Sequence, residues 1–112
     1  MIYRIVTEGE WRAALKDGLF EGSAHDRRDG FIHFSTAAQA AETAEIHYAG
    51  KSGLLLLCVD AGALTAPLKW EASRGGGLFP HLYGALPVDA VRRVEKLPLG
   101  PDGRFVFPKL EP

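Results

Sequence analysis

The chain has a single cysteine among its 112 residues. One cysteine cannot form a disulfide within the chain, which fits a protein of the reducing cytoplasm. Cys58 stands inside the apolar run 54–59, and its neighbours predict a buried structural thiol rather than a reactive nucleophile. We therefore expect a cytoplasmic location and no disulfide chemistry.

The sequence also lacks an excess of charge of either sign. It has 13 Lys and Arg against 14 Asp and Glu, for a formal net charge of −1. Scattered basic residues give no electrostatic footprint for nucleic acid or for an anionic membrane. The balance argues against nucleic acid as a general partner but leaves 2′-phosphorylated RNA ends open.

Long hydrophobic runs are absent as well. Residues 1–6 show no basic segment followed by an extended apolar stretch, so we expect neither a signal peptide nor a membrane span. A chain of 112 residues can form one hydrophobic core. We expect a single domain over residues 1–112, and the sequence leaves its oligomeric state open.

Two helices are predicted in the N-terminal half. Thr7 is followed three residues later by Glu10, a capping-box pattern, and Gly18 is placed to end that helix after an apolar stripe that includes Leu15. The same signature at Thr36 predicts a second helix over 37–48, with an inward stripe of small residues that includes Ala41. Residues 21–30 are polar and aperiodic and are predicted to be a loop.

Short strands are predicted for most of the remainder. The continuous apolar run 54–59 is typical of a central strand, and Pro101–Gly103 is a turn signal before a terminal hairpin strand. The pattern favours an α+β domain over a doubly wound one. The expected strands cover residues 1–6, 30–36, 54–59, 68–72, 79–84, 91–97 and 104–107.

Polar residues interrupt two of these strands in a similar way. In Gly30-Phe31-Ile32-His33-Phe34-Ser35-Thr36, an imidazole and a hydroxyl stand two residues apart. Successive strand side chains alternate between faces, so Phe31, His33 and Ser35 share one face while Ile32 and Phe34 point to the core. Because burying unpaired polar groups is costly, this face is a candidate pocket wall.

The second polar string is Phe79-Pro80-His81-Leu82-Tyr83-Gly84. Phe79, His81 and Tyr83 alternate onto one face, with Leu82 on the other. Such a row suits a planar ligand ring that is stacked and hydrogen-bonded at its edge. The alternative is an amphipathic edge strand whose Tyr83 hydroxyl only contacts water.

Two further features suit an anionic ligand. Ser35 and Thr36 stand at a strand-to-helix junction, where free N–H groups favour a phosphate, although Thr36 could simply cap the helix and His33 could be structural. Arg74 is followed by three glycines and could bind phosphate, or the segment could be a flexible surface loop.

Glu71 is the best-placed carboxylate for general-base work or for stabilising an oxocarbenium ion.

Metal-ligand spacing is not evident. The chain has four histidines, but none stands in His-x-x-x-His spacing, and Cys58 has no second cysteine beside it. His47 is predicted to lie on a helix away from both polar strings. We therefore assign no metal ligands from the sequence.

The two polar strings, with Lys69-Trp70-Glu71 between them, resemble the bacterial family named domain of unknown function 952. The opening Ile2-Tyr3-Arg4-Ile5 and Trp11 extend the resemblance over nearly the whole chain. The family in turn resembles the ADP-ribosyltransferase-like fold, a compact split barrel of two small, mainly antiparallel sheets around an NAD-type cleft.

This resemblance implies roles for particular residues. His33 is similar to the ribose-binding histidine of that fold, Tyr83 to the aromatic residue that stacks on nicotinamide, and Glu71 or His81 to the residue that stabilises the ribosyl cation. Glu71 precedes Tyr83, whereas the usual order places the acidic residue last. NAD is then a substrate, and no other cofactor is expected.

Three hypotheses follow. The first is an ADP-ribosyltransferase-like enzyme acting on NAD or a related nucleotide-phosphate compound. The second is a non-catalytic module that binds a nucleotide or small metabolite, and the third is a hydrolase or phosphodiesterase with His33 and His81 as base and acid. The candidate catalytic residues are His33, Glu71 and His81, and the candidate ligand-binding residues are Phe31, Ser35, Thr36, Arg74, Phe79 and Tyr83.

Overall fold

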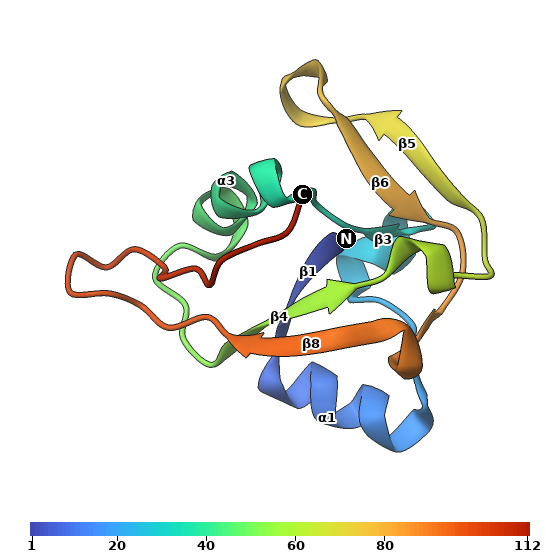
Figure 1. The fold of residues 1–112 in the computed structure, drawn as a ribbon, viewed down its shortest axis with the longest axis horizontal. Helices are drawn as coiled ribbons and strands as arrows, with labels where there is room; N and C mark the ends of the chain where they lie inside the picture. Colours follow the sequence, from blue (N-terminus) through green and yellow to red (C-terminus); the bar gives the residue numbers. More distant parts are fainter.

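A three-stranded antiparallel sheet, whose central strand is buried on both faces, forms the centre of the fold (Figure 1). Its strands are β1 (Ile2–Thr7), β4 (Leu54–Val59) and β8 (Val91–Lys96), in the order β1-β4-β8. The computed structural model describes residues 1–112, with the side chain of residue 74 outside the described part. The expected central strand at 54–59 is confirmed.

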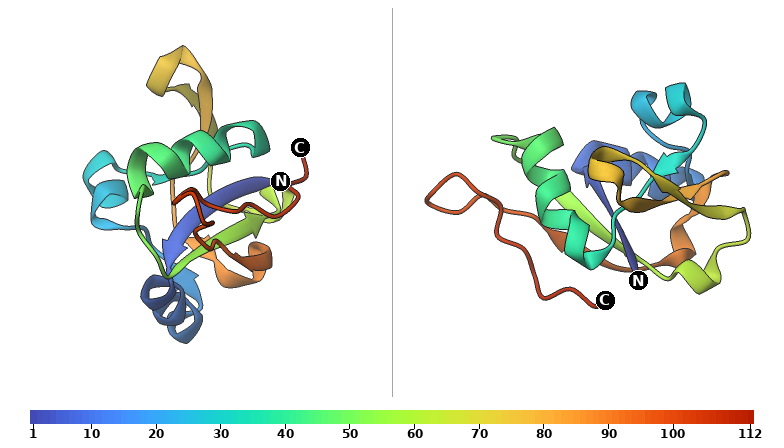
Figure 2. Two further views of the ribbon diagram at one scale, coloured as in Figure 1. Left: turned by 90° about the vertical axis from the view of Figure 1, so that its left-hand side faces the viewer. Right: turned by 90° about the horizontal axis from the view of Figure 1, so that it is seen from above.

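Helices cover this sheet from opposite sides, as Figure 2 shows for α1 (Glu8–Asp17) and α3 (Ala37–Tyr48). Along β4, Leu55, Leu57 and Val59 join the core on the α1 side. Leu54, Leu56 and Cys58 alternate onto the α3 side. Because both faces are buried, the strand has a continuous apolar run rather than an alternating one.

Cys58 is fully buried, as its apolar neighbours predict. Burial raises the pKa of its thiol, and the hydrogen bond from Arg93 only partly offsets this. The thiol is therefore an inert part of the core.

A second three-stranded antiparallel sheet has the order β3-β6-β5. It comprises β3 (Ile32–His33), β5 (Leu68–Ala72) and β6 (Leu78–Leu82). The β5–β6 hairpin, closed by the short turn η2 (Arg74–Gly76), extends away from the rest of the molecule (Figure 1). A separate two-stranded ribbon pairs β2 (Leu19–Phe20) with β7 (Leu86–Pro87).

The two three-stranded sheets are joined through residues 32–35, which we call the junction segment. Ile32 and His33 pair with β6, and the Phe34 amide donates to the Pro80 carbonyl at 3.0 Å. Ser35 then pairs with β1, exchanging two backbone hydrogen bonds of 2.8 Å with Tyr3. One polar string therefore belongs to both sheets.

Capping explains why α1 begins and ends where the sequence predicts. The Glu10 amide donates to the Thr7 hydroxyl at 3.0 Å, and the Thr7 amide donates to the Glu10 carboxylate at 2.8 Å. Gly18 ends the helix in the left-handed conformation with φ 82°. The predicted apolar stripe of this helix is wrong at Leu15. Ala14 is buried against the core, whereas the side chain of Leu15 is exposed to solvent.

The second predicted helix, over 37–48, is confirmed as α3. Ala40 and Ala44 are buried and allow the helix to pack closely on the sheet. Ala41 is exposed, so the predicted inward stripe is too wide by that residue.

The expectation of a loop over 21–30 is wrong, because α2 (Ala24–Asp29) lies there. Ser23 and Asp26 form a capping box, and Gly30 ends the helix with φ 87°. The fold is therefore α+β with three helices rather than two, and with three small antiparallel sheets rather than two. Polar composition hid the helix, although its capping pattern is present in the sequence.

The C-terminal segment differs from the prediction as well. The expected strand over 104–107 is reduced to a single bridge between Leu99 and Phe105. The segment packs instead on the α3 side of the central sheet, where the Tyr3 hydroxyl donates to the Glu111 carbonyl at 2.7 Å. Within the described residues, every helix is too short or too polar to span a membrane.

Candidate functional site

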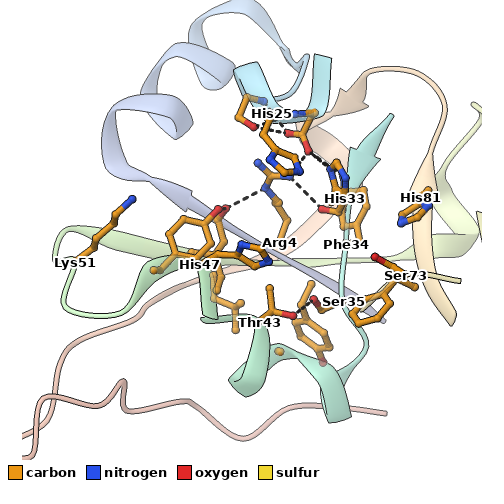
Figure 3. Close-up of a pocket in the computed structure, with 18 residues that line it drawn as sticks. Arg4, His25, His33, Phe34, Ser35, Thr43, His47, Lys51, Ser73 and His81 are labelled. Atoms are coloured by element: carbon orange, nitrogen blue, oxygen red, sulfur yellow. Dashed lines mark hydrogen bonds and ion pairs between the residues drawn. The ribbon is translucent and has the colours of Figure 1, made fainter. Parts of the chain in front are cut away.

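A cavity of about 350 Å³ lies beside the junction segment (Figure 3). This is at the small end of the range for small-molecule sites. All four histidines of the chain line it: His25 from α2, His33 from β3, His47 from α3 and His81 from β6. We call it the histidine cavity. The expectation that His47 lies away from the polar strings is wrong, because α3 packs beside the junction segment.

A buried ion pair forms one wall of the cavity. Nη1 of Arg4 lies 2.8 Å from Oδ1 of Asp26, and the two side chains are 8% and 2% exposed. Arg4 also donates to the His33 carbonyl, so it ties β1 to both α2 and β3. Burial opposes ionisation of Asp26, but hydrogen bonds from His33 and Arg4 outweigh it and hold the pKa of the carboxyl well below its usual range.

His33 has a carboxylate beside each ring nitrogen. Nδ1 lies 2.6 Å from Oδ1 of Asp26, and Nε2 lies 3.0 Å from Oδ2 of Asp29. Both nitrogens donate only when the ring carries two protons. The imidazole is therefore held in one orientation at the edge of the cavity.

His81 is the direct cross-strand partner of His33 and is buried. Its Nδ1 lies 2.9 Å from Oε1 of Glu71, which also accepts a 2.6 Å hydrogen bond from the Tyr83 hydroxyl. The Tyr83 bond and then the His81 bond lower the pKa of Glu71, and the Glu71 bond raises the pKa of Tyr83. An ionised Glu71 favours a proton on Nδ1 and leaves Nε2 as the basic nitrogen.

An aromatic ring covers the histidine pair. Phe31 stacks on His81 with ring centroids 4.0 Å apart and an angle of 23° between the planes. It also lies 4.6 Å from His33 and 5.2 Å from Tyr83. The two imidazoles themselves are 5.5 Å apart. The structure thus brings together Phe31, His33, Glu71, His81 and Tyr83, all of which the sequence singled out.

The other predicted site residues lie at different distances from this cluster. Ser35 and Phe79 line the histidine cavity, and the Ser35 hydroxyl is 2.9 Å from that of Thr43. Thr36 is the N-cap of α3, with its amide donating to Gln39, and is not among the described lining residues. The ligand-binding role expected for Arg74 lies outside the described residues.

The predicted core faces of the polar strings are confirmed. Ile32, Phe34 and Leu82 are all buried in the core on the α1 side. Their burial fixes the register of β3 against β6, because a slip of one residue would turn the histidines into the core.

Sequence reasoning missed several residues around the site. Arg4 interrupts the otherwise apolar strand 2–6, and such a charge signals a buried partner. His25, Asp29 and His33 follow one another at intervals of four, but the loop prediction for 21–30 concealed their helical spacing. Lys51 lines the cavity and carries no comparable signal.

The fold and the site define a small α+β protein whose two three-stranded sheets meet beside a histidine-rich cavity. Residues 5–94 match the family described as "Protein of unknown function (DUF952)", and the chain belongs to it. A comparison with curated proteins found no significant match.

Solved structures of one other protein are similar to this chain over nearly its whole length. The crystal structure of protein CC0527 from Caulobacter crescentus is 51% identical, covers 94% of this chain and 92% of that chain, and superposes with a TM-score of 0.89. The solution NMR structure of CC0527 is 52% identical, covers 92% and 89%, and has a TM-score of 0.82.

Proposed function

We propose that this protein binds a nucleotide-type ligand in the histidine cavity and acts on it as an ADP-ribosyltransferase-like enzyme, with NAD as the candidate substrate. The observation that carries the proposal is the cross-strand pair of His33 and His81, each held at Nδ1 by a carboxylate. Paired imidazoles with fixed orientation in a cavity are typical of sites for acid–base chemistry.

The charges of the cavity support an anionic ligand. Among the described lining residues that carry a formal charge, Arg4 and Lys51 are positive and only Asp26 is negative. Arg4 neutralises Asp26, and Asp29 and Glu71 stand beside the imidazoles of His33 and His81, so Lys51 is the lining cation that remains to attract a phosphate. The volume suits the burial of part of a dinucleotide rather than all of it.

In the proposed reaction, the bond between C1′ of the ribose and the nicotinamide nitrogen breaks, and nicotinamide leaves with the bonding electrons. An acceptor oxygen then bonds to C1′ and gives its proton to Nε2 of His81. Glu71 stabilises the resulting imidazolium through Nδ1, since its lowered pKa keeps it ionised. His33 orients the ribose. Phe31 and Tyr83 are not among the described lining residues of the histidine cavity, so the nicotinamide ring has to lie at the edge of the cavity beside His81 to stack on either of them.

A second candidate is cleavage of a phosphodiester by the same histidine pair. His33 has an acceptor at both ring nitrogens and suits the acid role, while His81 suits the base role. The two rings, with centroids 5.5 Å apart, are close enough to contact neighbouring oxygens of one phosphate from the same side. The first reaction releases nicotinamide and the second gives a cleaved phosphodiester. Identifying the product therefore distinguishes the two reactions.

Ligand binding is tested by thermal shift and calorimetry with NAD, ADP-ribose, mononucleotides and RNA ending in a 2′-phosphate. A ligand present at about 100 times its dissociation constant should stabilise the fold by about 2.7 kcal/mol. Glu71→Gln and His81→Gln should abolish nicotinamide release from NAD, while Glu45→Gln, on an exposed part of α3, should not. Absence of binding by all four ligand classes would overturn the proposal. Binding without turnover would instead support a non-catalytic module.

A further inference from the structure

Three potential metal ligands meet where α2 turns into β3. His25 and Asp29 are four residues apart on α2, so their side chains lie on one side of the helix. Gly30 ends the helix and turns the chain back, which places His33 beside both. The donor atoms of the three residues lie within 4.8 Å of one another.

The distances are close to those of a metal centre. Oδ2 of Asp29 is 3.3 Å from Nε2 of His25 and 3.0 Å from Nε2 of His33. Ligand atoms bonded to a tetrahedral zinc at about 2.0–2.1 Å lie about 3.3 Å apart. Two of the three separations therefore already fit. The third can close by rotation of His25, whose side chain is 52% exposed.

A buried carboxylate orients one of these ligands independently of the cluster. Asp26 accepts from Nδ1 of His33, which leaves the lone pair of a neutral ring on Nε2, the atom that faces Asp29. Asp26 is itself held by Arg4 and by the Ser23 amide, so its position is fixed. A carboxylate behind a histidine is the usual outer partner of a metal ligand.

We infer that His25, Asp29 and His33 form a binding site for a divalent transition-metal ion, Zn²⁺ in the first place. Two imidazoles and one carboxylate suit zinc and its neighbours, whereas Mg²⁺ and Ca²⁺ prefer oxygen ligands. Three protein ligands leave a coordination position open. His25 and His33 also line the histidine cavity, so this position adjoins it (Figure 3).

A bound metal replaces the contacts of Asp29 with Nε2 of His25 and of His33, and it displaces Arg28, whose Nε lies 3.7 Å from Oδ1 of Asp29. Arg28 lies 3.0 Å from Nδ1 of His25, and it can donate only while that nitrogen is unprotonated. Coordination through Nε2 places the ring proton on Nδ1. Because the Arg28 side chain is 70% exposed, it can move into solvent without leaving a buried charge.

The test is calorimetric titration of the untagged protein, stripped with EDTA, with ZnCl₂ and CoCl₂. We expect one equivalent of either ion to bind, a visible cobalt absorption band, and no binding of MgCl₂. Loss of a group that only hydrogen-bonds to a metal ligand weakens metal affinity about 10–100-fold. His25→Ala and Asp29→Asn each remove a ligand itself, so each should weaken the zinc affinity by more than that. His47→Gln, which changes another histidine of the cavity, should retain it.

Failure to bind one equivalent of zinc or cobalt would overturn the inference. So would unchanged affinity in both His25→Ala and Asp29→Asn, or a loss confined to His47→Gln. Both ligand variants alter partly exposed side chains, so circular dichroism should show a retained fold. Nucleotide binding measured with and without EDTA separates this inference from the proposed function, because either can fail alone.

Discussion

Carboxylates determine how each imidazole beside the junction segment is held. Asp26 and Asp29 lie within hydrogen-bond distance of the two ring nitrogens of His33, and Glu71 lies within that distance of Nδ1 of His81. Asp26 also forms an ion pair with Arg4. The Asp26 carboxylate is therefore the centre of a buried network rather than an isolated ion. A change at His33 or His81 therefore also removes a contact from its carboxylate partner.

Removing one member of the buried pair should be more damaging than removing both. Asp26→Leu leaves the buried Arg4 guanidinium without its carboxylate and should cost about 3–5 kcal/mol of unfolding free energy. Arg4→Met should also destabilise, because it leaves Asp26 only its contacts with His33 and Ser23. The double variant should recover part of that loss. Urea unfolding of the four proteins gives the coupling, and additive losses would show that the pair is not a unit.

Glu71 offers a test of the predicted titration. Hydrogen bonds from Tyr83 and His81 stabilise its ionised form, so NMR should place the pKa of its carboxyl below the ordinary value of about 4.3. Tyr83→Phe should raise that pKa again, because it removes the hydrogen bond that contributes most to the lowering. Because the folded pKa is lowered, the stabilising effect is present above the unfolded pKa and is lost as the pH falls through the folded value. A Glu71 pKa that does not respond to Tyr83→Phe would contradict the hydrogen-bond assignment.

At the scale of helices and strands, the local sequence determines most directly where a helix ends. Gly18 and Gly9 form a matched pair, because one stands in the left-handed conformation after α1 and the other lies within the helix. Gly18→Ala should cost about 1–2 kcal/mol, although an added Cβ would meet nothing within 4 Å. Gly9→Ala should stabilise by about 0.4–1 kcal/mol. Thermal unfolding of both variants checks the opposite signs, and equal signs would contradict the conformational argument.

How far the sequence predicts the fold depends on whether a signal is local. The central strand and the bounds of α3 follow from apolar periodicity and capping residues. The core and cavity faces of both polar strings follow from alternation. In contrast, α2 has few apolar residues to mark it, so only its two ends carried a signal, the capping box at Ser23 and the glycine at position 30.

The composition of the cavity depends on contacts between distant segments. His47 reaches the site because α3 packs on β1, and β1 is bonded to the junction segment. Nothing in the residues around His47 encodes that arrangement. The pairing of His33 with His81 is also a matter of strand order, which neither string contains by itself.

For the whole molecule, the junction segment should unfold with the central sheet rather than with the exposed hairpin. The Ser35 amide donates to Tyr3 at 2.8 Å, and the Leu97 amide donates to Leu54 at 3.1 Å, both among buried residues. The Ser73 amide donates to Gly77 at 3.1 Å near the exposed hairpin tip. Native-state hydrogen exchange should therefore show the denaturant dependence of global unfolding for Ser35 and Leu97, and local opening for Ser73. If Ser35 exchanges as Ser73 does, the two sheets open separately and the histidine cavity is not a fixed part of the core.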